Sequence, residues 1–407
     1  MFSQCSGARK EMIRLEVQYF NLNRILLLAV GLWPYQQSKL TRLQFIFLCS
    51  ILTTSIIFQL TSLITLRCTS VLVAKVVSSA SFFAVCLVTY SSFCANINNA
   101  KNLMVQCQHV YDELKDEKEI AIIKEYGYYT KCCTIAFMVM GIHFIIVIII
   151  IQYWTDTFDL ALSINVSQPH RIQFITEYFI DQEKYFFLIL LHINVAFCVG
   201  IVAIIAIGTI LIGYINFIFG MFKISSYRIE RIIEINIPQN FILKKKNFKS
   251  ESLICAVNIH RKAIRLSKYL VITFEIMFLS LAAVLIISLC FNFLRIFQIM
   301  SSGESIEKLF FPVTFVSVDI LYMFLCNFFG QNIIDHNNHV FITVYNIKWY
   351  VAPLQIQRMI LFLLLNNAKD FTIIVGGIFV GSMENFAMLI KAAISYFTVI
   401  LSVDTVN

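Results

Sequence analysis

The feature that most constrains the fold is a stretch of 38 residues, 185–222, that contains no Lys, Arg, Asp or Glu. As a helix it would be roughly 57 Å long at about 1.5 Å per residue, whereas the apolar core of a bilayer is about 30 Å thick. We therefore expect a membrane helix that continues into protein on the far side. The whole chain agrees, since only 14% of its residues are charged, against about a quarter in soluble proteins.

Six further stretches of low charge are long enough to cross a bilayer, so we expect a single all-α membrane domain over residues 1–407 with seven spans. The expected spans are residues 43–66, 76–99, 135–155, 185–216, 269–294, 309–334 and 371–403.

The distribution of basic residues predicts the orientation. Residues 223–268 hold eleven Lys and Arg, whereas 156–184 hold only Arg171 and Lys184, which favours a cytoplasmic N-terminus and an extracellular C-terminus. The glycosylation sequon at Asn165 falls in the segment then expected outside. The expected segments are 1–42 inside with a re-entrant piece at 25–35, 156–184 outside, and 217–268 and 335–370 inside.

The last span has an unusual pattern. We expect a helical segment from residue 371, a break at Gly376-Gly377, and a second helix from about Ser382, a residue suited to an N-cap. One face of this second helix mixes small, hydroxyl and apolar side chains at helical spacing. The members of interest are Ser395, Val399, Ser402 and Val403. Such a face suits a pore lining, but the residues alone favour a packing seam between membrane helices.

Other chemistries find little support. The sequence has no HExxH, GxSxG or phosphate-binding glycine loop, so we do not expect an enzyme. Six of the twelve cysteines lie inside apolar runs, and Cys132-Cys133 lacks metal-ligand spacing, so neither a metal nor a cofactor is expected. The net charge of +8 suits contact with membrane lipid better than with nucleic acid.

Several residues near the C-terminus resemble the signature of insect odorant receptors. They are Gly330, Tyr345, Trp349, Gly376-Gly377 and the run Ser395-Tyr396-Phe397, and the early Gly31-Leu32-Trp33-Pro34 is similar to that family's N-terminal region. The related gustatory receptors carry Gln and Phe where this chain has Ser402 and Val403, which favours the odorant branch. The odorant co-receptor has a much longer loop than 217–268, so the chain resembles a ligand-specific subunit.

The resemblance implies a channel subunit of the plasma membrane, in the dendrite of a sensory neuron. A volatile ligand would gate a nonselective cation channel, assembled with the odorant co-receptor as a heterotetramer. The broken seventh helices would line the central pore of the tetramer. The family's hydrophobic gate residue lies three positions after the tyrosine, which is Val399 here, and a ring of valines can close a pore by dewetting.

The resemblance also places the odorant pocket in the outer half of the bundle, between the second, third, fourth and sixth spans. The residues that we expect to line it are Phe82, Phe83, His143, Val147, Leu191, Asn194, Phe315, Asp319 and Tyr322. Phe315 falls close to a pocket aromatic of the family, whereas depth alone selects the others. Helix packing is the alternative for each Phe, and an interhelical hydrogen bond is the alternative for Asp319.

Three other functions stay open at this point. A gustatory-type channel of the same superfamily would share the fold. A transporter would be expected to show paired broken helices in internal repeats, but the sequence has one break, at its end. A heptahelical G-protein receptor would have its N-terminus outside, and residues 1–42 carry no sequon.

Overall fold

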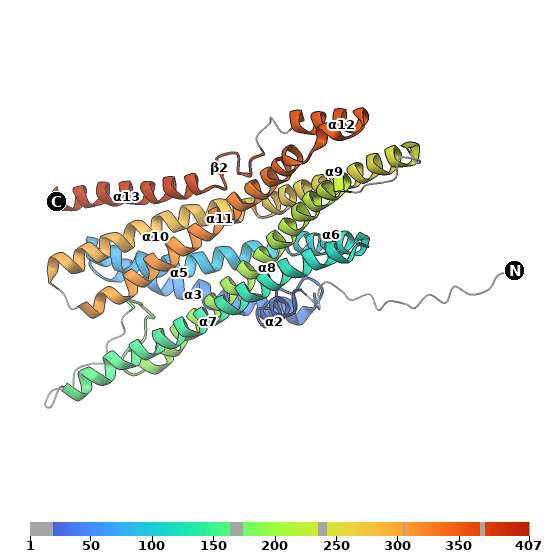
Figure 1. The fold of residues 1–407 in the computed structure, drawn as a ribbon. Helices are drawn as coiled ribbons and strands as arrows, with labels where there is room; N and C mark the ends of the chain where they lie inside the picture. The colour runs from blue at the N-terminus through green and yellow to red at the C-terminus, as the bar shows by residue number, and fades with distance from the viewer. Residues whose placement is uncertain (1–18, 163–173, 235–241, 304–305, 367–370, 407) are drawn as a thin grey trace.

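The structure is a computed structural model that describes residues 19–162, 174–234, 242–303, 306–366 and 371–406. Within these ranges the chain is almost entirely helical, and the helices run roughly along one common axis (Figure 1). The helices are α2 (Asn21–Ala29), α3 (Lys39–Leu60), α4 (Ser62–Thr65), α5 (Ser70–Ala95), α6 (Ile97–Glu113), α7 (Glu117–Leu162), α8 (Phe186–Glu234), α9 (Ile242–Thr273), α10 (Glu275–Ser302), α11 (Phe310–Asn346), α12 (Leu354–Asn366) and α13 (Met383–Val406). Two 3₁₀ turns (Ile306–Leu309 and Trp349–Val351) and the strands β1 (Ile374–Val375) and β2 (Phe379–Val380) complete the described chain.

Seven of these helices are long and apolar enough to cross a bilayer, which confirms the predicted number of spans. They are α3, α5, α7, α8, α10, α11 and α13. Helices α5 and α8 lie at the centre, because 61% of the most apolar window of each is buried within the chain. The corresponding share is 17% for α3 and α7 and only 11% for α13, which therefore lie at the periphery.

The helix ends differ from the predicted bounds. A charge-free run ends where the bilayer ends, but a helix does not have to, so α7 has 46 residues and α8 has 49. The expected inner segment 217–268 is mostly helical for the same reason. Its basic residues alternate with Leu253, Ala256 and Ala263, which are buried at helical spacing, and this pattern makes α9 an amphipathic helix.

Helix α9, helix α12 and the adjoining ends of α8 and α11 project together from one end of the bundle (Figure 1). Ion pairs join the neighbouring α6–α7 corner to this projecting end. Glu119 accepts hydrogen bonds of 2.7 and 2.8 Å from Nε and Nη2 of Arg228, a two-point geometry that is specific to a guanidinium. Lys262 donates to Glu113 at 2.5 Å, and this bond lowers the pKa of the Glu113 carboxyl.

The predicted re-entrant piece at 25–35 begins within the short helix α2. Asn23 of this helix is buried and donates to Thr209 Oγ1 of α8 at 2.8 Å and to Thr134 Oγ1 of α7 at 3.3 Å. Tyr90 of α5 donates to the carbonyl of Val30 at 2.7 Å. The segment is thus held against three helices; whether it dips into the bilayer stays a prediction.

The chain before α13 is interrupted at the predicted glycine pair, but the expectation of a helix from residue 371 is wrong. Residues on either side of the pair form a small antiparallel hairpin, in which Ile374 pairs with Val380 and Val375 with Phe379. Gly376 and Gly377 have φ angles of +63° and +68°, in the left-handed region that glycine tolerates at no steric cost. Such a turn, beside β-branched residues, favours a hairpin over a helix.

Two contacts fix this hairpin in the bundle. The backbone N–H of Gly376 donates to Glu275 Oε1 at 2.6 Å, so the carboxylate of Glu275 caps the turn. Gly330 of α11 lies directly against Gly381, and a Cβ built on Gly330 would lie 2.7 Å from the Gly381 carbonyl oxygen. From the hairpin the chain turns into α13, whose Ser382 Oγ accepts from the N–H of Asn385 at 3.2 Å, as expected of an N-cap.

We predict that Gly330→Ala destabilises the protein, because the new methyl group meets backbone that cannot swing aside. Overpacking of this kind costs about 1–3 kcal/mol. The measurement is the thermal unfolding midpoint of purified protein in detergent. Gly208→Ala is the matched control, since it gains the same helix propensity and a Cβ there has no neighbour within 4 Å. Equal midpoints for both variants would contradict the tight contact.

Candidate functional site

Phenylalanines from several helices form an aromatic cluster toward the end of the bundle that carries the segment before α8. Phe82 and Phe83 of α5, Phe197 of α8 and Phe315 of α11 are each at most 5% exposed. The ring centroids of Phe82 lie 5.4 Å from Phe315 and 5.2 Å from Phe197. Phe83 lies 4.8 Å from Phe197. The structure therefore brings three of the predicted pocket residues together.

The same cluster includes residues that the sequence reasoning missed. Phe197 is central to it, and Phe174, from the segment before α8, lies 5.3 Å from Phe197 and 4.9 Å from Phe311. Phe144 of α7 lies 6.4 Å from Phe82. Phe197 follows the predicted Asn194 by three residues, so the helical period of α8 was a signal that could have found it.

Residues 174–185, the segment before α8, are held beside the cluster by contacts of Tyr178. Tyr178 stacks on Phe58 of α3 with a centroid separation of 4.2 Å. Its hydroxyl lies 2.7 Å from Nδ1 of His192, and Nε2 of the same ring lies 3.1 Å from Thr54 Oγ1. His192 thereby links α8, α3 and this segment, which explains a polar group at membrane depth without a ligand.

Four other predicted pocket residues were chosen by depth alone, and depth does not show which face of a helix points inward. Asn194 is half-buried, and its Oδ1 is a buried acceptor without a hydrogen-bond partner among the described residues. Val147 is also half-buried, whereas His143 is exposed on α7 and Leu191 is 58% exposed on α8. His143 and Leu191 therefore lie on the surface of the subunit, outside the aromatic cluster. On α8 the inward face is formed by residues such as Ile193.

Two roles were expected for Asp319, lining the pocket or bonding to another helix, and the structure shows an interhelical hydrogen bond. It is 4% exposed and accepts from Ser288 Oγ of α10 at 2.5 Å. Ser288 Oγ in turn accepts from Ser81 Oγ of α5 at 2.9 Å. Next to this chain, Ser78 donates to Asn292 Oδ1 at 2.5 Å. These hydroxyls join α5, α10 and α11 across the centre of the bundle, as polar groups do in membrane proteins.

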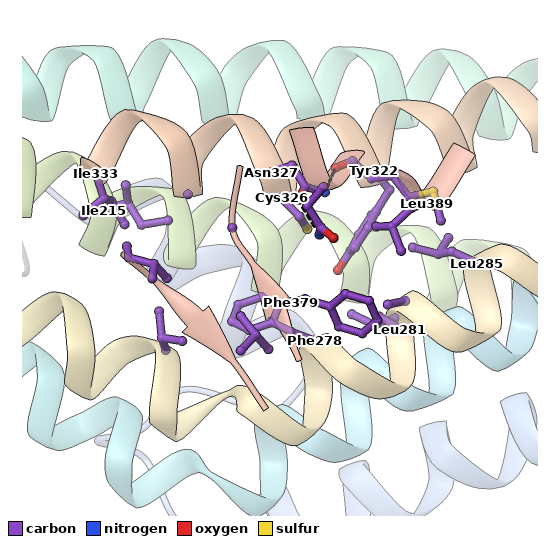
Figure 2. A pocket seen from close by; sticks show the side chains of 18 of the residues that line it. Ile215, Phe278, Leu281, Leu285, Tyr322, Cys326, Asn327, Ile333, Phe379 and Leu389 are labelled. Atoms are coloured by element: carbon purple, nitrogen blue, oxygen red, sulfur yellow. Dashed lines mark hydrogen bonds between the residues drawn. The ribbon is translucent and has the colours of Figure 1, made fainter. Parts of the chain in front are cut away.

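Tyr322 lies apart from the aromatic cluster. It lines a separate cavity of about 110 Å³ between α10, α11, α13 and the hairpin (Figure 2). No residue of the aromatic cluster is part of its wall.

The predicted pore residues occupy the outward face of α13. Ser395 and Ser402 are exposed, and Val399 and Val403 are 57% and 56% exposed. The opposite face carries the buried side chains Asn385, Leu389 and Ala393, which pack toward α10 and α11. The mixed face is therefore not a packing seam within the subunit.

This face also carries a charged residue that was not among the predicted pore residues. Lys391 is exposed and precedes Ser395 by four residues, so it lies on the same line of the helix. A lysine at membrane depth is costly against lipid, so this line suits water or another protein chain. The sequon residue Asn165 lies outside the described residues.

The family of the chain follows from its sequence as well as from its fold. A family model described as the 7tm odorant receptor matches residues 69–394. Since this match spans most of the chain, the protein belongs to the odorant receptor family, a family of membrane receptors and not of enzymes.

Two solved structures of the insect olfactory receptor OR5 from Machilis hrabei are similar to this chain. The structure in complex with eugenol gives a TM-score of 0.76, and the structure described without a ligand gives 0.74. Each is 15% identical in sequence and covers 96% of this chain and 99% of the receptor. At this identity the likeness shows the fold, a mostly helical receptor with seven spans. No curated protein sequence matches the chain significantly.

Proposed function

We propose that the protein is the ligand-specific subunit of an odorant-gated, nonselective cation channel. One observation carries the proposal: in an odorant receptor, the terminal helix turns a face with Lys391, Ser395 and Val399 away from the rest of its own subunit. Such a face needs water or other subunits beside it, and a channel supplies both.

The proposed pore runs along this face of α13. Hydroxyls and an ammonium group on one line favour a water-filled path over contact with lipid. Val399 lies one turn beyond Ser395 on the same line, where the exposed valine of each copy of this chain narrows the path. An apolar constriction keeps water out of a closed pore, and ions do not pass without water.

The proposed odorant site is the region of the aromatic cluster. Volatile ligands are recognised by apolar and aromatic walls with few polar groups, and Phe82, Phe197 and Phe315 supply such walls from three helices. The buried Oδ1 of Asn194, which lacks a partner among the described residues, would accept a hydrogen bond from a ligand. The similar receptor bound to eugenol supports a ligand-binding role for this fold.

The proposed setting is the dendrite of a sensory neuron, where the chain joins the odorant co-receptor in a tetramer. Its N-terminus would be cytoplasmic, because Lys and Arg gather on α9 and the adjoining inner segments. In this orientation the projecting end with α9 and α12 lies inside the cell, α13 ends outside, and Asn165 is available for glycosylation.

We predict that Val399→Ala raises the current that flows without odorant when the chain is expressed with the co-receptor. A smaller side chain widens the constriction and lets water in more readily. The readout is leak current in whole-cell recordings, normalised to surface protein. Ile394→Ala is the control, since Ile394 is also exposed on α13 but lies off this line. A leak that is the same for both variants and the wild type would remove Val399 from the gate.

We predict that Phe315→Leu shifts the odorant concentration giving half-maximal current by about tenfold, because an aromatic contact in the proposed wall is lost. Leucine retains much of the volume and limits the loss of packing. Responses to an agonist of the co-receptor serve as the control for assembly. Loss of both responses would indicate a folding defect, and an unaltered odorant response would exclude Phe315 from the site.

The proposed orientation predicts that an epitope placed after Asn407 is labelled on intact cells, whereas an epitope before Met1 is labelled only after permeabilisation. A heptahelical G-protein receptor would give the reverse pattern. Antibody labelling by flow cytometry distinguishes the two outcomes directly.

A further inference from the structure

The cavity lined by Tyr322 lies at the base of the proposed pore helix, apart from the aromatic cluster. Helix α10 contributes Phe278 and Leu285, α11 contributes Tyr322, and Phe379 of β2 covers one side (Figure 2). Leu389 of α13 also faces the cavity. The wall is thus shared between the central bundle, the hairpin and the helix that carries the proposed gate.

Two buried asparagines give this apolar cavity one polar side. Asn327 Nδ2 donates to the carbonyl of Met323 at 2.9 Å, which leaves its Oδ1 to accept from Asn385 Nδ2 at 3.0 Å. These two bonds fix the orientation of both amides. Asn385 Oδ1 is left over: it is buried and has no hydrogen-bond partner among the described residues, in a side chain that is 5% exposed.

An unpaired buried acceptor is costly unless something donates to it. The cavity has about 110 Å³, and an engineered apolar cavity of about 150 Å³ accepts benzene. The cavity is smaller than that engineered one, so a single small ring is the upper limit of the size that it accepts. Its body would contact Phe278, Leu285 and Leu389, and a single hydroxyl would satisfy Asn385.

We infer that this cavity binds a small alcohol or phenol, whose hydroxyl donates to Asn385 Oδ1 and whose apolar body packs between α10 and α13. Because Asn385 and Leu389 belong to α13, the bound molecule stabilises one position of that helix and so modulates gating. The binding step does not require the proposed channel function, whereas the effect on gating rests on it.

Binding is tested by fluorine NMR on purified protein in detergent, with 4-fluorophenol as the probe and 4-fluorotoluene as the analogue without a hydroxyl. Ala282 lines the cavity, so Ala282→Phe fills it, whereas Ala283→Phe adds the same ring at the adjacent exposed position. We expect broadening of the 4-fluorophenol signal with the wild type and Ala283→Phe, and none above that of empty micelles with Ala282→Phe. Because 4-fluorotoluene cannot donate a hydrogen bond to Asn385 Oδ1, we expect it to bind about fivefold more weakly than 4-fluorophenol.

Asn385→Leu and Phe315→Leu separate the two sites. We expect Asn385→Leu to abolish the preference for 4-fluorophenol over 4-fluorotoluene, and Phe315→Leu to leave it intact. If Ala282→Phe binds the probe as the wild type does, or if Phe315→Leu abolishes binding, the cavity is not the site. Should Ala282→Phe fail to fold, Leu389→Phe provides a second way to fill the same space.

The effect on gating is tested by adding 4-fluorophenol during odorant titrations of cells that express the chain with the co-receptor. We expect the half-maximal odorant concentration to shift for the wild type and Ala283→Phe and to stay constant for Ala282→Phe. Binding without any shift would overturn the coupling to α13. If no variant carries odorant-gated current while NMR shows binding, the proposed function fails and the binding site stands.

Discussion

The position of the terminal helix depends on a contact between two backbones. Gly330 of α11 and Gly381 approach so closely that a single methyl group on Gly330 would meet the peptide carbonyl opposite. Glu275 adds a second anchor, because its carboxylate accepts the N–H of Gly376 at 2.6 Å. The hairpin is therefore attached to α10 and α11 at once, and α13 begins three residues after its second strand. Any movement of α10 against α11 is passed to the root of α13.

The centre of the bundle is held by hydroxyl and amide groups, because apolar surface gives helices little reason to choose one another inside a bilayer. Ser81, Ser288 and Asp319 form one chain of hydrogen bonds between α5, α10 and α11. Asn23 similarly joins α2 to α7 and α8. Each of these hydrogen bonds forms only when its two helices lie at one position along each other. The polar groups therefore fix the relative register of the helices, which apolar packing alone does not determine. The same helices then supply the rings of the aromatic cluster.

The sequence predicted the parts of the fold that depend on the contrast between the apolar bilayer and water. Seven apolar runs gave the spans, and the length of residues 185–222 showed that a helix continues beyond the bilayer. Hydropathy could not locate helix ends, since α7 and α8 continue through charged residues. It also could not choose faces: Phe82 and Phe315 point into the cluster, whereas His143 lies on the outside at similar depth. The face of a helix that points inward depends on which helices lie beside it, and a single sequence does not show which helices are neighbours.

The hairpin was missed for a related reason. A glycine pair in an apolar segment signals a break, but the form of the break depends on partners far away in the chain. Here Glu275 lies 101 residues before Gly376, and Gly330 lies 51 residues before Gly381. The Asn327–Asn385 bond, between α11 and α13, is equally remote. Local sequence showed that the chain turns near Gly376, and tertiary contacts decided that it turns as two strands.

Helix α13 is buried unevenly along its length, and this has a consequence for the proposed gate. Its buried side chains, Asn385, Leu389 and Ala393, all lie in the half next to the hairpin, and no side chain between residues 394 and 403 is fully buried. The half that carries Val399 therefore has little support from its own subunit. Regions with few buried contacts move at low cost in free energy. A small rotation at the anchored root would thus displace the less buried half, and in the proposed channel the neighbouring subunits would provide the packing that holds Val399 in the closed position. The proposed gate would in this sense depend on the assembly, although the hairpin contacts that position α13 lie within one chain.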